Sequence, residues 1–179
     1  MQDFYPITIA GIKRNLPIRK INNNLSIALF NLFGDVEITV ASAAALLNAV
    51  ADFDIILTPE AKSIPLAYEM ARQSQKPYIV ARKSAKLYMQ NPATVQVKSI
   101  TTESVQTLVI CEDDAKLLKS RKVLIVDDVI STGESLIAAQ TLVKNCGGLI
   151  ADCCAALAEG DAANRDDIIF LEKLPLFFD

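Results

Sequence analysis

The chain has 179 residues, a length that suits one domain, and 51% of them are hydrophobic, which excludes an intrinsically disordered protein. It contains no histidine, which excludes Ser-His-Asp and Cys-His catalysis and histidine-based metal sites. The formal net charge is −3 and the sequence has no concentrated basic run, so we expect no nucleic-acid partner.

The four cysteines lie in apolar runs without metal-ligand spacing, so we interpret them as buried free thiols. They are Cys111, Cys146, Cys153 and Cys154. Free thiols are typical of a reducing compartment. The sequence has neither a leader pattern nor an apolar stretch long enough to span a bilayer, so we expect a cytoplasmic protein with no membrane partner.

The first 33 residues are predicted to form a small flap. Two short runs, 5–10 and 16–21, are typical of strands, and three asparagines follow the second run. Residues 34–179 then form the core of a single domain that spans 1–179.

The core begins with a predicted helix from Asp35, a candidate N-cap, to residue 50. Apolar side chains recur at helical spacing along it. Its predicted inner face consists of Val36, Val40, Ala43, Leu46 and Leu47.

Two strand-loop units with polar loops follow. A buried strand at 54–58 runs into Glu60-Ala61-Lys62-Ser63 and a helix from Ile64. A strand at 77–81 leads to Arg82-Lys83, and clustered basic residues can neutralise a leaving group as its charge develops. Each loop also has an alternative interpretation without a function. Lys62 could be a solvated surface lysine, and Arg82-Lys83 could be only the basic tip of a hairpin.

Residues 84–104 lack strong periodicity and are predicted to form a flexible hairpin or lid, in which Glu103 is the one acid and a candidate for proton transfer. A strand at 107–111 and a short helical turn at 113–118 come next.

The segment 122–135 carries the densest polar chemistry. An apolar strand, 123–126, is ended by Asp127 and Asp128, and a hydroxyl-rich turn at 131–135 opens a helix that Gly147-Gly148 stops. A helix N-terminus with hydroxyl donors suits a phosphate, and paired carboxylates suit vicinal hydroxyls or the water shell of a cation. The loop matches neither Walker A nor Gly-x-Gly-x-x-Gly spacing.

A last buried strand is predicted at 149–157, with Glu159 at its carboxyl end. A capped turn at 164–166 and a strand at 168–171 complete the chain.

The run from Val123 to Ser135 resembles, without a break, the phosphoribosyl pyrophosphate (PRPP) signature of type I phosphoribosyltransferases. The resemblance implies an α/β, Rossmann-like fold, a parallel sheet flanked by helices with a small N-terminal hood. It also implies that Asp127 and Asp128 hold the ribose hydroxyls, directly or through Mg²⁺. The 5′-phosphate would bind to Ser131, Thr132, Gly133, Glu134 and Ser135.

Two residues depart from the family pattern. Glu134 stands where most members carry glycine and adds a third carboxylate beside the phosphate site. Ser63 also replaces a usual glycine. In addition, Ser131 stands where hypoxanthine-guanine enzymes of the best-known kind place an aspartate.

The other two loops are similar to the family's pyrophosphate and catalytic loops. Glu60-Ala61-Lys62 resembles the Glu-Ala-Arg of adenine-type enzymes and the Glu-Ser-Ser of xanthine-type enzymes, a loop often built around a cis peptide. The resemblance implies that Glu60, Ala61, Lys62 and Ser63 bind pyrophosphate and that Lys62, Arg82, Lys83 and Glu103 are catalytic. The base would contact Val129, Ile130 and Glu159.

The activity implied by this resemblance is transfer of phosphoribose from PRPP to a purine with Mg²⁺, by a homodimer. We favour a 6-oxopurine such as hypoxanthine or guanine, with adenine as the alternative. A non-enzymatic regulator that senses PRPP or a nucleotide, or a generic nucleotide-binding domain, would use the same fold. A sensor needs only the sugar-phosphate loop, so the placement of the basic residues discriminates between an enzyme and a sensor.

Overall fold

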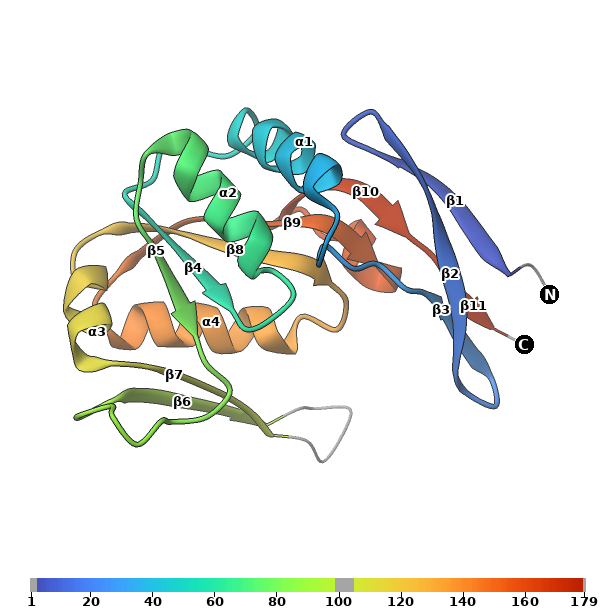
Figure 1. Cartoon of the computed structure of the whole chain (residues 1–179). Coiled ribbons are helices and arrows are strands. Elements are labelled where there is room, and N and C mark those ends of the chain that lie inside the picture. Colours follow the sequence, from blue (N-terminus) through green and yellow to red (C-terminus); the bar gives the residue numbers. More distant parts are fainter. Residues whose placement is uncertain (1–2, 99–104, 179) are drawn as a thin grey trace.

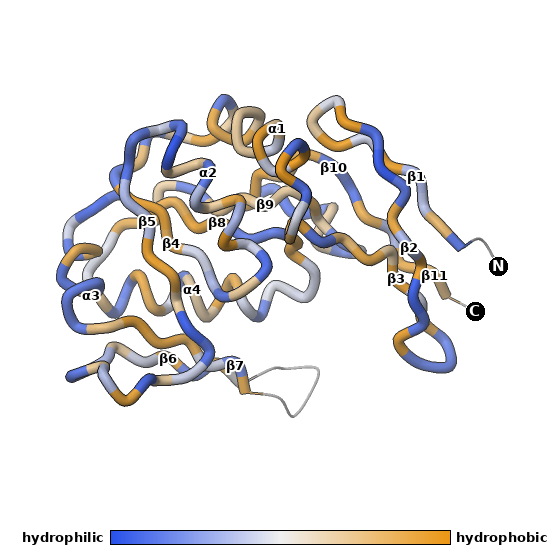
Figure 2. Tube along the Cα trace, viewed as in Figure 1, coloured by the Kyte–Doolittle hydropathy of each residue, from blue (hydrophilic) through white to orange (hydrophobic). Residues whose placement is uncertain are grey.

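A five-stranded parallel sheet, in the order β10-β9-β8-β4-β5, forms the centre of the protein (Figure 1). The structure is a computed structural model that describes residues 3–98 and 105–178. The five strands are β4 (Ile55–Pro59), β5 (Tyr78–Ala81), β8 (Lys122–Ile130), β9 (Leu149–Glu159) and β10 (Ile169–Leu174). The apolar runs of the three inner strands, β4, β8 and β9, are buried on both faces, as expected for a parallel sheet, and in Figure 2 the hydrophobic colour follows β4 and β8 through the centre.

Helices cover both faces of this sheet (Figure 1). On one face, α1 (Val36–Leu47) and α2 (Ile64–Ser74) share a buried cluster with β8 and β9. On the other face, α4 (Glu134–Asn145) and α3 (Glu112–Leu118) share a second cluster with the hairpin of β6 (Ala93–Lys98) and β7 (Val105–Ile110). The predicted α/β fold, a parallel sheet flanked by helices, is confirmed. Within the described residues no helix has the length and apolarity needed to cross a bilayer.

A separate antiparallel sheet forms the hood. It contains β1 (Phe4–Ile9), β2 (Ile12–Asn22), β3 (Leu25–Ala28) and β11 (Leu176–Phe178), in the order β1-β2-β3-β11. The predicted N-terminal flap therefore also includes the C-terminal strand, and both chain ends lie at the hood in Figure 1. Pairing between β3 and β11 joins segments about 150 residues apart, which local sequence patterns do not reveal.

Strand β8 differs from its predicted bounds. It does not end at Val126 but continues through Asp127 and Asp128 to Ile130, paired with β9 along its length. The predicted boundary was wrong because carboxylates are disfavoured in buried strands. Here the strand continues from the core to the edge of the sheet, where both carboxylates line cavities.

The buried face of α1 also differs from the prediction. Asp35 caps this helix as predicted, because its Oδ1 accepts a hydrogen bond from the Ile38 amide at 3.3 Å. However, Val36 and Val40 are 73% and 39% exposed. The buried residues are Ile38, Thr39, Ser42, Ala43 and Leu46. The helix has apolar residues on more than one of its sides, so more than one line of apolar side chains fits helical spacing.

The hairpin after β5 packs against the core. Val95 and Leu108 are buried in the same cluster as α4, and Arg82 exchanges backbone hydrogen bonds with Val109 at 2.8 and 2.7 Å. The strand β6 thus forms part of a hairpin in the predicted region, and this hairpin packs against the core. The flexibility of residues 84–104 stays a prediction. Glu103, the predicted proton-transfer residue, lies outside the described residues.

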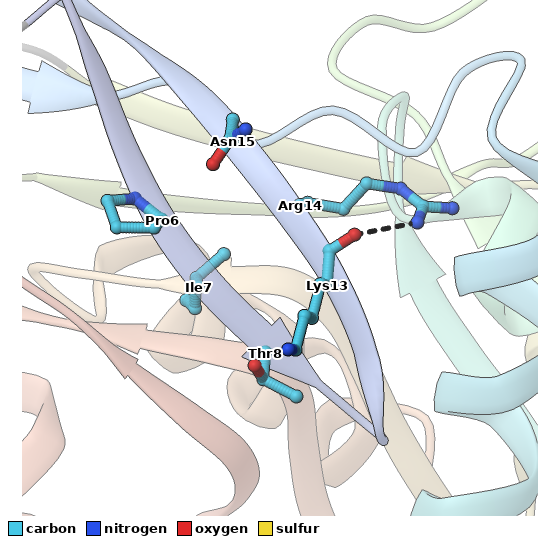
Figure 3. Close-up of a pocket in the computed structure, with 6 residues that line it drawn as sticks. All are labelled: Pro6, Ile7, Thr8, Lys13, Arg14 and Asn15. Atoms are coloured by element: carbon cyan, nitrogen blue, oxygen red, sulfur yellow. Dashed lines mark hydrogen bonds between the residues drawn. The ribbon is translucent and has the colours of Figure 1, made fainter.

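Arg14 on β2 attaches the hood to the core. Its Nε and Nη2 donate to the two carboxylate oxygens of Asp35 at 2.7 and 2.8 Å, and Nη2 also donates to Glu37 at 2.8 Å. Figure 3 shows Arg14 extending away from the neighbouring side chains of a shallow β1–β2 cavity of about 520 Å³, while its Nη1 donates to the Lys13 carbonyl. A bidentate pair of this kind fixes orientation as well as distance.

We expect Arg14→Met to loosen the hood. The variant should unfold at a lower temperature than the wild type, with faster amide exchange in β1 and β2 but not in β8. Arg14 lowers the pKa of Asp35, so the stability difference should be present at neutral pH and should disappear as Asp35 becomes protonated on acidification.

The matched control is Arg19→Met. Arg19 lies on the same strand and also donates to its neighbour's carbonyl, at 2.9 Å. Equal melting points for the two variants, measured by thermal unfolding, would show that the pairing with Asp35 does not hold the hood.

Candidate functional site

The polar loops meet at one edge of the parallel sheet. Strands β5, β4 and β8 are neighbours that run in the same direction, so the segments after Ala81, Pro59 and Ile130 leave the sheet side by side. In open α/β sheets, ligands bind in the crevice outside these carboxyl ends.

The loop after β8 surrounds a small cavity of about 100 Å³, here called the loop cavity. Its lining is Asp127, Val129, Ile130, Ser131, Thr132, Gly133, Glu134, Ser135 and Leu136. Gly133 has φ +81° and is the N-cap of α4; as a glycine it has no side chain to accept a hydrogen bond from the first turn, in contrast to Asp35 of α1. The N-terminus of α4, the positive end of its dipole, therefore borders the cavity, a position that favours an anion.

Glu134 is half-buried and lines the same cavity. The residue that departs from the family signature thus belongs to the cavity wall and is not wholly exposed to solvent. Its own amide remains one of the N–H groups of the first turn, so a negative side chain and a positive helix end lie at the same place.

A second cavity of about 190 Å³, the hood pocket, lies between the hood and the sheet edge. Its lining is Ile27, Ala28, Leu29, Phe30, Lys62, Asp128, Val129, Ser131, Glu159 and Leu174. Apolar walls with a few convergent polar groups are typical of a pocket for a flat organic ligand. The loop cavity and the hood pocket share Val129 and Ser131, so they adjoin each other.

The two aspartates serve the two cavities separately. Asp127 lines the loop cavity, and Asp128, only 9% exposed, lines the hood pocket. Burial, and secondly the neighbouring Asp128, raise the pKa of Asp127 well above its usual value. A ligand that brings hydroxyl donors or a cation would stabilise this pair of acids, because either one compensates the buried negative charge.

The loop after β4 is held by buried hydroxyl groups. The Glu60–Ala61 peptide is cis, as the family resemblance implied. Ser63 is 1% exposed and donates to the Pro59 carbonyl at 2.6 Å, and Thr58 Oγ1 lies 2.8 Å from both Ser63 Oγ and the Val126 carbonyl oxygen. The serine that replaces a usual glycine thus ties this loop to the end of β4, whose Thr58 also contacts β8.

Glu60 fixes the start of the basic loop. It accepts a hydrogen bond from the Lys83 amide at 2.8 Å, and its carboxylate lies 3.6 Å from Nη1 of Arg82. The side chain of Lys83 is exposed, and its charge is close enough to lower the pKa of Asp127. Lys62 approaches the other acid, because it lines the hood pocket with Asp128.

The described residues contain no group of three or more histidine, cysteine or acidic side chains that could hold a metal ion. Asp127 and Asp128 provide two carboxylates, and Mg²⁺ is typically held by one or two carboxylates together with substrate phosphates. The donor set is therefore compatible with Mg²⁺ that enters with a phosphorylated ligand, and the Mg²⁺ requirement stays a prediction.

Most predicted site residues converge on these two cavities. Glu103 lies outside the described residues. The residues of the two neighbouring loops that line neither cavity are Glu60, Ala61, Ser63, Arg82 and Lys83. Ile130, predicted to contact a base, lies in the wall of the loop cavity. Glu159 and Val129 do line the hood pocket. Sequence reasoning missed the hood residues of that pocket, Leu29 and Phe30 among them, because an apolar run in a flap has no local sign of pocket formation.

Solved structures share this fold over nearly the whole chain. Adenine phosphoribosyltransferase from Thermoanaerobacter pseudethanolicus aligns with a TM-score of 0.68 at 23% identity, covering 96% of this chain and 95% of that one. The enzyme from Saccharomyces cerevisiae aligns with a TM-score of 0.67 at 16% identity, covering 94% of each chain. At these identities the likeness concerns the fold.

Sequence relatives are closer but match over a shorter span. Adenine phosphoribosyltransferase of Bifidobacterium adolescentis is 34% identical over 111 residues, which cover 62% of this chain and 55% of the relative. Hypoxanthine/guanine phosphoribosyltransferase of Methanocella paludicola is 31% identical over 119 residues, which cover 66% of this chain and 59% of the relative. The chain thus spans little more than half the length of these curated relatives.

The model of the phosphoribosyl transferase domain matches residues 34–174, from the start of α1 to the end of β10. That span includes both cavities' sheet-edge residues and the signature segment, and it excludes most of the hood. The chain therefore belongs to the phosphoribosyl transferase domain family.

Proposed function

We propose that this protein transfers the phosphoribosyl group of PRPP to a purine base and releases pyrophosphate. The observation that carries the proposal is the position of the acid pair between two adjoining cavities. The loop cavity offers helix amides and hydroxyls for the 5′-phosphate, and the hood pocket offers apolar walls for a base. A ribose that links phosphate to base would lie over Asp127 and Asp128.

Catalysis would come from positioning and charge neutralisation. Transfer breaks the bond from the ribose anomeric carbon to pyrophosphate and forms one to a base nitrogen, through an oxocarbenium-like centre. Lys62, Arg82 and Lys83 extend from the two loops beside the acids, where they can stabilise negative charge on the departing pyrophosphate. No protein nucleophile is needed, and the pockets hold the reactants together.

Mg²⁺ is proposed as the cofactor on the chemistry of the donor set. Asp127 and Asp128 would hold the ion through water or through the ribose hydroxyls, and the ion would neutralise pyrophosphate charge when bound. The raised pKa of Asp127 favours such an arrangement, because a cation relieves the repulsion between the acids.

Adenine is the base we now favour. The sequence relatives named above include adenine and hypoxanthine/guanine enzymes, and most of the strongest matches carry the adenine name. These names support the alternative in our sequence analysis better than the 6-oxopurine we favoured there. In the hood pocket, Glu159 offers an acceptor that suits an exocyclic amino group.

The test is a panel of adenine, hypoxanthine, guanine, xanthine and orotate with PRPP and Mg²⁺, in which pyrophosphate release is measured. We expect the highest kcat/KM with adenine. Release with orotate alone would contradict a purine enzyme, and release with no base would contradict base transfer.

A PRPP-sensing regulator is the second candidate. The basic residues argue against it. Lys62 and Lys83 lie beside the acids, and a site that binds only the sugar phosphate would not require these two lysines. Tight PRPP binding without pyrophosphate release on any base in the panel would favour the regulator.

The homodimer remains a prediction that rests on family resemblance. We expect sedimentation at micromolar concentration to give the mass of two chains. A single-chain mass at all concentrations tested would contradict it.

A further inference from the structure

Arg165 lies outside every predicted motif, yet its side chain is held in a defined orientation beside the phosphate loop. It follows the 3₁₀ turn η1 (Gly160–Asn164) between β9 and β10. Its Nε and Nη2 donate to the two carboxylate oxygens of Asp167 at 2.8 and 2.7 Å, and its side chain is 29% exposed. This pairing raises the pKa of Arg165 and lowers that of Asp167, so both groups are charged at neutral pH.

The remaining guanidinium nitrogen, Nη1, packs against Gly133. A Cβ atom placed on Gly133 would lie 2.6 Å from Nη1 and 3.9 Å from Cζ of Arg165. Side-chain carbons do not approach a nitrogen so closely, so the guanidinium fills the space that any other residue would need. The φ of +81° thus favours glycine at 133, and a side chain there would displace the guanidinium from the position in which Asp167 holds it.

The contact places a positive charge at an electrostatically unfavourable position. Gly133 is the N-cap of α4, and a cation at a helix N-terminus opposes the helix dipole. The arrangement becomes favourable once an anion occupies the loop cavity, because the phosphate then attracts both the helix amides and the guanidinium.

We propose that Arg165 is a positioning residue for the 5′-phosphate, which holds Gly133 in place and supplies a fixed positive charge behind the loop. The inference rests on the proposed function, because it assigns the loop cavity to the phosphate of PRPP. Asp167 acts through Arg165, since it fixes the guanidinium and leaves Nη1 directed at Gly133.

The first experiment compares ligands with and without phosphate. Arg165→Gln should weaken binding of PRPP and of AMP by about tenfold, as expected for loss of a charge interaction of moderate strength, and should leave binding of free adenine unchanged. Calorimetry gives all three dissociation constants. Equal losses for adenine and AMP would indicate a general structural defect and would overturn the assignment.

The matched control is Arg72→Gln. Arg72 forms the same kind of two-bond pair, with Glu69 at 2.8 and 2.7 Å, but on α2 and away from the loop cavity. We expect this variant to bind PRPP and AMP like the wild type. If both arginine variants lose the same affinity, the effect of Arg165 is not specific to the phosphate loop.

The second experiment tests the contact itself, without any ligand. Gly133→Ala, Arg165→Ala and the double variant form a thermodynamic cycle in which the melting temperature is measured. Gly133→Ala should be less destabilising when Arg165 is already alanine, because only the strain of positive φ remains. Additive effects would show that Arg165 does not hold Gly133 and would overturn the inference even if the enzyme is active.

The two experiments also separate this inference from the proposed function. Wild-type protein that fails to bind PRPP refutes the proposed function, and the cycle still reports the contact. Wild-type protein that binds PRPP, with an Arg165→Gln variant that binds it equally well, refutes the role of Arg165 alone.

Discussion

Replacement of both aspartates, Asp127→Asn with Asp128→Asn, is expected to abolish PRPP binding while the fold remains intact. Each carboxylate would accept hydrogen bonds from the ribose diol or hold the water shell of Mg²⁺. A hydrogen bond to a charged group contributes roughly 1.5–3 kcal/mol, so loss of two should reduce affinity on the order of 10²- to 10⁴-fold. Calorimetry with PRPP and Mg²⁺ measures the change.

Stability should change in the opposite direction to binding. Burial and Asp128 raise the pKa of Asp127, so the folded protein binds this proton more tightly than the unfolded chain does. The ionised acid therefore destabilises the free protein increasingly as pH rises through the raised pKa. Asp127→Asn should melt at a higher temperature than the wild type at pH 7 to 8, and the difference should disappear at acidic pH.

A suitable control is Asp113→Asn, which removes an exposed carboxylate on α3. It should change neither PRPP affinity nor the pH dependence of melting. The amide of Asp128 donates to Asp127 Oδ1 at 2.9 Å, and asparagine preserves this acceptor, so local geometry should survive the change. Unaltered PRPP affinity in the double variant would refute the ribose assignment.

The sequence predicted the core of the fold because most of its determinants are local. Unbroken β-branched runs such as 123–126 predict strands buried on both faces, and Asp35 predicts a capped helix start; both features are observed. The signature segment likewise predicted one cavity around residues 131–135, since consecutive residues of a tight loop necessarily surround the same space.

Features that depend on distant segments were not predictable. The hood acquires β11 from the other end of the chain, and the hood pocket combines Phe30 with Leu174. The contact between Arg165 and Gly133 was not predictable for the same reason. The two residues lie on different elements, and no spacing pattern in the sequence relates them. Such pairings are decided by how the layers pack, which periodicity does not encode.

The separation of Asp127 and Asp128 between two cavities also required the structure. Adjacent residues of a strand point to opposite faces, but the predicted strand ended before the pair and left their directions open. Because the strand continues, one acid faces the phosphate loop and the other faces the hood. Under the proposed function, this geometry would place the ribose of PRPP between its 5′-phosphate and the base.

Lys83→Gln is expected to reduce the rate of transfer far more than it reduces substrate binding. The charge of Lys83 acts on Asp127, and the Lys83 amide is fixed by Glu60, so its ammonium is held near the proposed pyrophosphate. Loss of one group that stabilises charge developing in the transition state typically costs about 10²- to 10³-fold in kcat. Steady-state kinetics with adenine and PRPP would give kcat and KM separately.

Two measurements distinguish a role at pyrophosphate from a role at the sugar phosphate. The affinity for AMP, which lacks pyrophosphate, should be unchanged in Lys83→Gln. Lys83 also lowers the pKa of Asp127, so its removal should raise that pKa and shift the acidic limb of PRPP binding to higher pH. Lys144→Gln, an exposed lysine at the opposite end of α4, should produce neither the loss of rate nor the shift. A loss of AMP affinity as large as the loss of kcat would place Lys83 at the sugar phosphate instead.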